Sequence, residues 1–176
     1  MPYTSLSACT ELFWTKSHPE GRYELVLDGQ PLAWLQHGEY WNSESQAGFA
    51  GYQWSFRRPG AALGHTEIRQ NDLPNPVATY KSHWGGGGTL TFSDGARFLV
   101  SCSGVWHHVW SLLDENGRTV LSVGPHSRRV LLSRPQGANL ASEDHDRLLF
   151  LIVFLWHEIL QARDEAELVA VMTATS

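Results

Sequence analysis

The sequence predicts a mainly β protein (α+β class), with about twelve antiparallel strands in a closed β-barrel around a central apolar C-terminal helix. Three observations lead to this fold. The segment LLFLIVFLWHEIL (148–160) begins with nine residues that carry no polar side chain. The preceding chain consists of short alternating runs rich in Trp and Tyr, residue types that favour strands. Three Asp-Gly or Asn-Gly dipeptides separate such runs, as at tight hairpin turns.

The apolar segment is expected to be a helix buried inside the protein. Nine consecutive apolar residues wrap a helix more than twice, so no face remains for water. Thirteen residues span only about 20 Å as a helix, less than the roughly 30 Å of a bilayer core. Ser142 is a candidate N-cap, and three acids in the first turn suit the positive end of the helix dipole. We therefore expect a helix over 143–161 as the barrel plug, followed by a tail over 162–176.

Short strands are expected throughout the chain before this helix. Most are bounded by turn signals such as Asp28-Gly29 or by the loop sequence NDLPNP. The run 46–51 stays ambiguous. With no long-period repeat or linker, 1–176 is expected to form a single domain. The expected strands are 11–15, 22–27, 32–37, 46–51, 52–57, 62–69, 77–81, 89–92, 97–102, 106–113, 118–123 and 129–133.

A closed sheet accounts for both the short alternating strands and the fully apolar helix. Closure hides the strand edges and leaves an interior wide enough for side chains or a helix. Residues that alternate along each strand would then face the helix and the solvent in turn.

The charge distribution argues against nucleic acid as a partner. The formal net charge is −5, and all of it comes from residues 141–176, which hold seven acids and two arginines. Residues 1–140 hold eleven acids and eleven bases and are neutral. A nucleic-acid-binding protein would show a basic face instead.

Cysteine usage and the first residues favour a cytoplasmic location. Cys9 and Cys102 form no CxxC pattern and no dense disulfide framework. The start, MPYTSLSACTELFW, lacks a basic region followed by an apolar run, so no signal peptide is expected. The chain is therefore expected to be soluble and not an integral membrane protein, with peripheral attachment to a membrane as a further option.

The order of these segments resembles the superfamily of Tubby C-terminal domains, phospholipid scramblases and plant LURP-one-related proteins. The resemblance lies in YELVLDGQPLAWL (23–35), GGGTLTFSDGARF (86–98) and LLFLIVFLW (148–156). The chain is also similar in layout to small uncharacterised bacterial proteins of that type. The resemblance covers roughly 12–160 as a pattern without a diagnostic motif. It implies a twelve-stranded barrel around a C-terminal helix, relatives that are membrane-associated or regulatory, and no shared catalytic site.

Histidines are the first candidates for chemistry, and they do not predict a metal site. His107 and His108 are adjacent in an expected strand, so they point to opposite faces and cannot share one ion. The chain has no HxH or HExxH motif. We expect structural or exposed histidines, no metal and no cofactor. Trp84, His108 and His157 are candidates for a pocket at the barrel mouth.

No catalytic residue is predicted. The run Gly85 to Gly88 lacks the spacing of a P-loop or dinucleotide motif and precedes a strand, so a loop between strands is the better interpretation. The chain has no GxSxG motif, and neither cysteine lies in a recognisable nucleophile motif.

Arginine supplies the only indication of binding. The chain has eleven arginines and two lysines, and arginine is suited to bidentate contact with phosphate or carboxylate. The anion-binding or lipid-binding candidates are Arg57, Arg58, Arg128, Arg129 and Arg134. Ordinary solvated strand ends are the competing interpretation.

Two classes of function remain open. The first is a non-enzymatic binding or scaffold module that recognises anionic phospholipid or a protein partner. The alternative is a small-molecule carrier or enzyme that uses a cavity at the barrel mouth. A barrel filled by its own helix has little room for a ligand, which favours the first class.

Overall fold

The computed structural model describes residues 12–18, 21–38, 44–49, 51–59, 64–71, 73–83, 86–103, 109–133 and 142–174. Within these residues the chain forms twelve antiparallel strands and one helix, α1 (Ser142–Ala174). The strands are β1 (Leu12–His18), β2 (Arg22–Leu27), β3 (Gln30–Gln36), β4 (Ser45–Phe49), β5 (Tyr52–Arg57), β6 (His65–Gln70), β7 (Ala78–Ser82), β8 (Gly88–Phe92), β9 (Arg97–Ser103), β10 (Val109–Leu113), β11 (Thr119–Val123) and β12 (Val130–Leu132).

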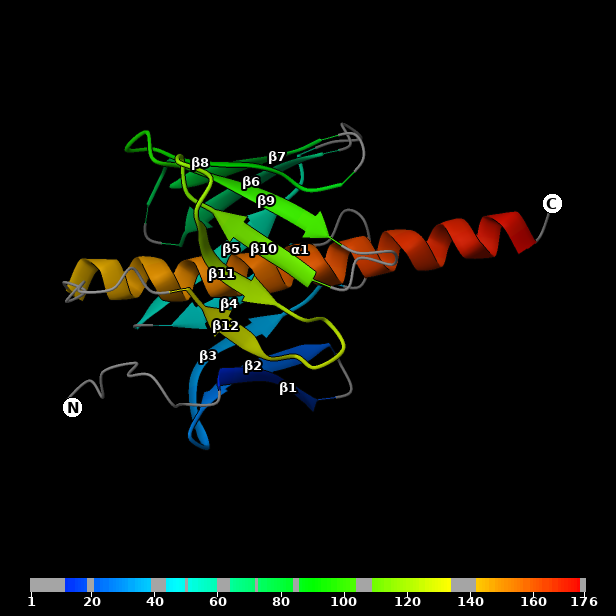
Figure 1. The fold of residues 1–176 in the computed structure, drawn as a ribbon, viewed down its shortest axis with the longest axis horizontal. Helices are drawn as coiled ribbons and strands as arrows, with labels where there is room; N and C mark the ends of the chain where they lie inside the picture. Colours follow the sequence, from blue (N-terminus) through cyan, green and yellow to red (C-terminus); the bar gives the residue numbers. More distant parts are fainter. Residues whose placement is uncertain are drawn as a thin grey trace.

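The strands form one sheet in which each strand pairs with its neighbours in sequence, from β1 to β12. The two ends of this sheet approach each other. The backbone N–H of Trp14 in β1 donates to the carbonyl of Arg128, at 2.8 Å, and Phe13 forms an isolated bridge with Arg129 just before β12. The result is a nearly closed barrel. Figure 1 shows α1 with β6 to β9 drawn above it and β1 to β3 below it.

The dipeptides that predicted hairpins lie in tight turns. Asp28 and Gly29 both have positive φ, 48° and 78°, which is the conformation of the type I′ turn that joins twisted antiparallel strands. Gly95 and Gly117 also have positive φ, in the turns before β9 and β11. The predicted strands all coincide with observed strands and differ only at their ends. The predicted strand residues 11, 50, 62, 63 and 106–108 lie outside the described residues.

The apolar part of α1 is buried, as the sequence predicts. Every residue from Leu149 to Leu160 is buried. Its aromatic side chains contact residues from well-separated strands. Phe150 packs against Phe49 of β4 and Phe92 of β8, whereas Trp156 stacks on Trp14 of β1 with ring centroids 5.6 Å apart. The core of the protein is therefore built between this helix and strands that are well separated in the sheet order.

Two features of α1 differ from the sequence-based expectation. The sequence predicts a helix that ends at residue 161, but α1 continues without interruption to Ala174. The region expected to be a tail is therefore helical, and Figure 1 shows it extending beyond the strands. His157, a candidate for a pocket at the barrel mouth, is buried together with its neighbour Glu158. The point of exit lies about one turn later, after Gln161.

No helix among the described residues is long and apolar enough to cross a bilayer.

Candidate functional site

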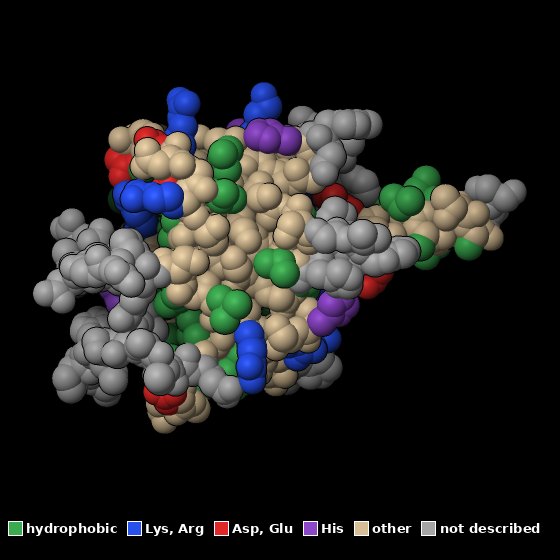
Figure 2. Space-filling view, viewed as in Figure 1, with side chains coloured by type: hydrophobic (Ala, Val, Ile, Leu, Met, Phe, Trp, Pro, Cys, Tyr) green, Lys and Arg blue, Asp and Glu red, His purple; other side chains and the backbone are tan. Residues whose placement is uncertain are grey.

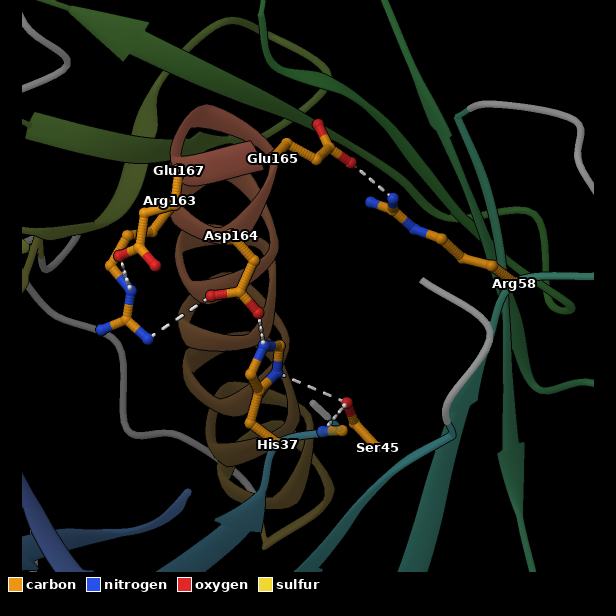
Figure 3. Close-up of polar contacts among 8 residues, drawn as sticks. His37, Ser45, Arg58, Arg163, Asp164, Glu165 and Glu167 are labelled. Atoms are coloured by element: carbon orange, nitrogen blue, oxygen red, sulfur yellow. Dashed lines mark hydrogen bonds and ion pairs between the residues drawn. The ribbon is translucent and has the colours of Figure 1, made fainter. Parts of the chain in front are cut away.

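Polar side chains from three strands and from α1 meet where the helix leaves the barrel. His37 follows β3, Ser45 begins β4 and Arg58 follows β5. Because these strands are antiparallel neighbours, all three residues lie at the same end of the barrel. The helix brings Asp164 and Glu165 to the same end. Figure 3 shows these side chains arranged around α1. We call this region the helix exit.

His37 is the centre of the network at the helix exit. Its Nε2 lies 2.7 Å from Oδ2 of Asp164, and its Nδ1 lies 3.5 Å from Oγ of Ser45. The Ser45 hydroxyl oxygen also accepts a hydrogen bond from the Gly38 N–H, at 3.1 Å. A carboxylate can only accept, so a neutral His37 donates from Nε2–H to Asp164 and accepts from Ser45 at Nδ1. This arrangement satisfies both ring nitrogens.

One ion pair attaches the helix to the rim on another side, and further pairs lie along the helix. Arg58 Nη1 lies 2.6 Å from Oε1 of Glu165, and the arginine side chain is only 15% exposed. On the helix itself, Arg163 lies 3.5 Å from Asp164 and 3.7 Å from Glu167. Ion pairs with a solvent-exposed partner contribute about 0–1 kcal/mol each, so the main effect of the Arg58–Glu165 pair is to fix the position of the helix rather than to stabilise the fold strongly.

A second polar layer lies beneath the first. His157 stacks on Phe56 with centroids 4.7 Å apart, and its Nδ1 lies 3.2 Å from Oε1 of Glu158. The His157 ring also meets the edge of His37, at 6.0 Å. Burial, with the nearby Glu158 carboxylate as a smaller cause, raises the pKa of Tyr80, so its hydroxyl stays protonated. These buried groups continue the network from the rim into the barrel.

Ser45, His37 and Asp164 contact one another in the same order as the residues of a catalytic triad. Their burial, however, indicates a structural role. The side chain of Ser45 has an exposed fraction of 0%, so a substrate has no access to its hydroxyl. A nucleophile must meet the reacting carbon at about 3 Å. The three residues therefore link β3, β4 and α1 and do not present a nucleophile.

Two hollows flank α1 at the helix exit, and Tyr23 and Arg163 line both of them. The first, of about 480 Å³, is lined by charged groups and by Leu168 and Val171 of the helix; we call it the ionic hollow. The second, of about 430 Å³, is the aromatic hollow. Its walls are formed by Tyr23, Trp110, Pro125, His126, Arg128, Trp156, Ile159, Leu160, Ala162, Arg163 and Ala166. A third hollow of about 350 Å³ lies near the start of α1 and includes Trp54, Phe92 and Arg147.

The predicted arginine candidates do not form one surface. Arg58 is held by Glu165 and is therefore occupied. Arg57 is exposed at the end of β5, whereas Arg128 and Arg129 are exposed before β12. Of these four, only Arg58 and Arg128 line one of the three hollows. Arg134 lies outside the described residues.

Of the three residues predicted to line a pocket at the barrel mouth, only His157 lies within the described residues. Trp84 and His108 lie outside the described residues. His157 is buried beneath the helix exit and lines none of the three hollows. Sequence reasoning missed His37, Ser45, Asp164 and Tyr23. No local motif marks them, because His37 and Asp164 are 127 positions apart and meet only in the folded chain.

Metal and thiol chemistry find no support in the part of the chain that the structure describes. No group of three or more His, Cys, Asp or Glu side chains is placed there to hold a metal ion. Burial raises the pKa of the Cys102 thiol to about 11, so the reactive thiolate is scarce near neutral pH.

Comparison with family models, with curated proteins and with solved structures gives no match for this chain.

The helix exit makes stability depend on pH through His37. Burial is the largest cause that lowers the pKa of His37 below 6.5; the hydrogen bond that His37 donates to Asp164 acts in the opposite direction, and His157 lowers the pKa further. Because the folded pKa is the lower one, the unfolded chain binds the proton more strongly. Folding stability is therefore retained above about pH 6.5 and falls as pH drops through the window below it.

We expect His37→Gln to be less stable than the wild type at about pH 8, by about 1–3 kcal/mol, because a buried hydrogen-bond network is weakened. The difference should shrink as pH falls to about 5, since only the wild type carries the penalty of protonating residue 37. Thermal melts of both proteins across this range would measure the gap. A gap that stays constant with pH would contradict the assignment.

Proposed function

We propose that the protein is a non-enzymatic binding module that engages a protein partner through the exposed end of α1. We further propose that the barrel is closed, that α1 is its central element, and that the chain shares the architecture of the Tubby, scramblase and LURP-one-related superfamily. The order of twelve strands, the contact of β1 with the chain before β12, and the buried helix support these architectural proposals.

The observation that carries the functional proposal is the surface of residues 168–174, which we call the helix tip. Its sequence, LVAVMTA, contains no charged side chain. Val169, Val171 and Met172 are 59%, 61% and 62% exposed. The Thr173 hydroxyl donates back to the helix carbonyls of Val169 and Ala170, both at 3.0 Å. The tip thus presents an apolar surface, and Figure 2 shows hydrophobic side chains along it with acidic ones only near its base.

A helix that is apolar on most of its surface is ordinarily covered by another molecule or by protein. Leu168, Val169 and Met172 are spaced as i, i+1 and i+4 and form one stripe. This is the pattern of a helix that lays an apolar face into a hydrophobic groove of a partner. The Arg58–Glu165 ion pair and the hydrogen bond of His37 with Asp164 connect the base of the helix to the barrel rim, so the tip is presented in a fixed direction at low entropic cost.

The charges at the base favour a protein over an anionic membrane. Residues 163–167 contain one arginine and three acids, and an anionic surface would repel their net negative charge. Arg58, a candidate for lipid contact, is occupied by Glu165. A pair of tips from two copies is also too small to form a stable dimer alone, because two helical turns bury far less than about 800 Å² per partner.

The test compares the wild type with the double variant Val169→Glu/Met172→Glu in the full chain. A matched control, Leu99→Glu/Leu131→Glu, adds the same charge to exposed apolar positions on the barrel wall. Each protein is used as bait in lysate of the source organism. Any protein that only the wild type and the control retain is then purified and titrated by calorimetry. We expect saturable binding that the tip variant weakens about tenfold or more, which corresponds to ~1.4 kcal/mol.

Three outcomes would overturn the proposal. The purified candidate binds the tip variant as well as the wild type. Vesicles of phosphatidylcholine and phosphatidylserine bind the wild type but not the tip variant, which identifies a membrane as the target. Light scattering shows a dimer that the tip variant abolishes, which identifies a second copy of the chain.

A further inference from the structure

The aromatic hollow lies beside the seam where β1 meets the chain before β12. Its inner wall is apolar, with Trp110 and Trp156 contributing indole rings and Ile159 and Leu160 contributing aliphatic side chains. Trp156 is itself buried and stacked on Trp14, so this wall is rigid. At about 430 Å³, the hollow falls within the range of roughly 300–1,000 Å³ that is usual for small-molecule sites.

Two arginines, Arg128 and Arg163, give the rim of the aromatic hollow positive charge. His126, Arg128 and Arg163 line it, and no carboxylate lies among its described lining residues. Arg163 shares its charge with Asp164 and Glu167. Arg128 forms no ion pair among the described residues, and its side chain is exposed. In Figure 2, His and basic side chains lie on the face below the point where α1 leaves the barrel.

The backbone of Arg128 is held in an unusual conformation. Its φ is 56°, in the left-handed region that non-glycine residues rarely adopt. Both of its backbone groups are engaged. The N–H donates to the Gly124 carbonyl, at 2.7 Å, and the carbonyl accepts from the Trp14 N–H, at 2.8 Å. These bonds fix the direction in which the guanidinium leaves the chain, beside the hollow.

We propose that the aromatic hollow binds a small organic anion with an apolar body, such as an aryl or short alkyl carboxylate. The apolar body lies against the indole and aliphatic wall, and the carboxylate pairs with the guanidinium of Arg128. Arginine holds a carboxylate with two parallel hydrogen bonds, which orients the ligand. A cation would meet like charges at the rim. This site is separate from the helix tip, so it does not depend on the protein partner proposed above.

The test uses calorimetry with two soluble acids, 4-phenylbutyrate and octanoate, on the full chain. The neutral amides of the same acids serve as matched ligands, because they have similar bodies without the charge. We expect one site per chain, with each acid bound about tenfold or more tightly than its amide. A mixed phosphatidylcholine and phosphatidylserine vesicle provides a separate arm for a membrane-borne anion.

Three variants localise the site. Arg128→Gln removes the charge and should weaken acid binding about tenfold while leaving amide binding unchanged. Ala166→Trp fills the hollow from an exposed helix position and should abolish binding of both acids and amides. Arg129→Gln is the control, because Arg129 is adjacent to Arg128 but does not line the hollow. Circular dichroism confirms that each variant is folded.

Several results would overturn the proposal. Neither acid gives saturable binding to the wild type at millimolar concentration. The acids and amides bind equally. Binding survives both Arg128→Gln and Ala166→Trp, or Arg129→Gln weakens it as much as Arg128→Gln does. Arg128-dependent binding to vesicles without binding of either soluble acid would assign the anion to a membrane surface instead.

Discussion

Replacement of Phe150 by aspartate is expected to prevent folding. Phe150 is buried, and its ring meets the rings of Phe49, Trp54 and Phe92 at centroid distances of 5.0–6.4 Å. A carboxylate at this position would have no partner among these aromatic groups. The penalty for such burial is several kcal/mol, against a total stability of about 5–15 kcal/mol for a typical domain.

Soluble yield, far-UV circular dichroism and thermal melting of Phe150→Asp would measure the effect. Phe150→Leu is the matched control, because it keeps an apolar side chain and should remain folded with a loss of about 1–3 kcal/mol. A soluble aspartate variant that melts with the wild type would show that this part of α1 is not the core.

The second large effect is expected at Gly87. Its φ is 72°, and a Cβ added there would overlap the backbone carbonyl of Val100 in β9. A flexible side chain could move aside, but a strand backbone cannot do so without disturbing the pairing of β8 with β9. Gly87→Ala should therefore destabilise the protein by about 3 kcal/mol or more, through the combined cost of the left-handed conformation and the displaced strand.

Gly29→Ala provides the comparison for this prediction. Gly29 has a similar φ of 78°, yet an added Cβ meets nothing within 4 Å. The Gly29→Ala variant therefore measures the cost of the left-handed backbone conformation alone, about 1–2 kcal/mol. Chemical denaturation of both variants would give the two free energies of unfolding. Equal losses would mean that the contact with Val100 has no effect.

Gly87 also shows where a sequence pattern had more than one interpretation. The run Gly85 to Gly88 was interpreted as a loop between strands because it lacks phosphate-binding spacing. The structure places Gly88 within β8 and buries Gly87 and Gly88, where added Cβ atoms would overlap Val100 and Lys81. These glycines permit close approach of backbones. A run of glycines in the sequence does not by itself show which strands will pack closely against it.

The elements with strong local signals were predictable. The apolar run 148–156 allowed no exposed face, and residues 149–156 are indeed buried. The turn at Asp28-Gly29 needed residues that tolerate positive φ. The helical extension after Gln161 had a weaker signal: 162–174 contains no Gly or Pro to end a helix, and Arg163 and Glu167 are spaced i, i+4. The prediction instead ended the helix at 161, soon after the apolar run, and left 162–176 as a tail.

The candidate site was harder to predict, because it depends on contacts between distant segments. Arg58 belonged to an arginine pair that suggested anion binding, but its partner is Glu165, 107 positions later. The position of Arg128 beside the aromatic hollow depends on the meeting of β1 with the chain before β12. Its positive φ has no sequence signal, since arginine rarely adopts it.

The order of elements determines how this chain can fold as it is synthesised. A ribosome releases all twelve strands before the helix that packs against them, since β12 ends at Leu132 and the buried helical segment is complete only at Leu160. At about 5–20 residues per second, roughly 30 residues of further synthesis leave the buried strand residues without their helical packing partner for seconds. Neighbouring hairpins can pair during that interval, but the hydrophobic core is complete only when the helix arrives. Nascent chains stalled before residue 148 should therefore remain sensitive to protease and dependent on chaperones.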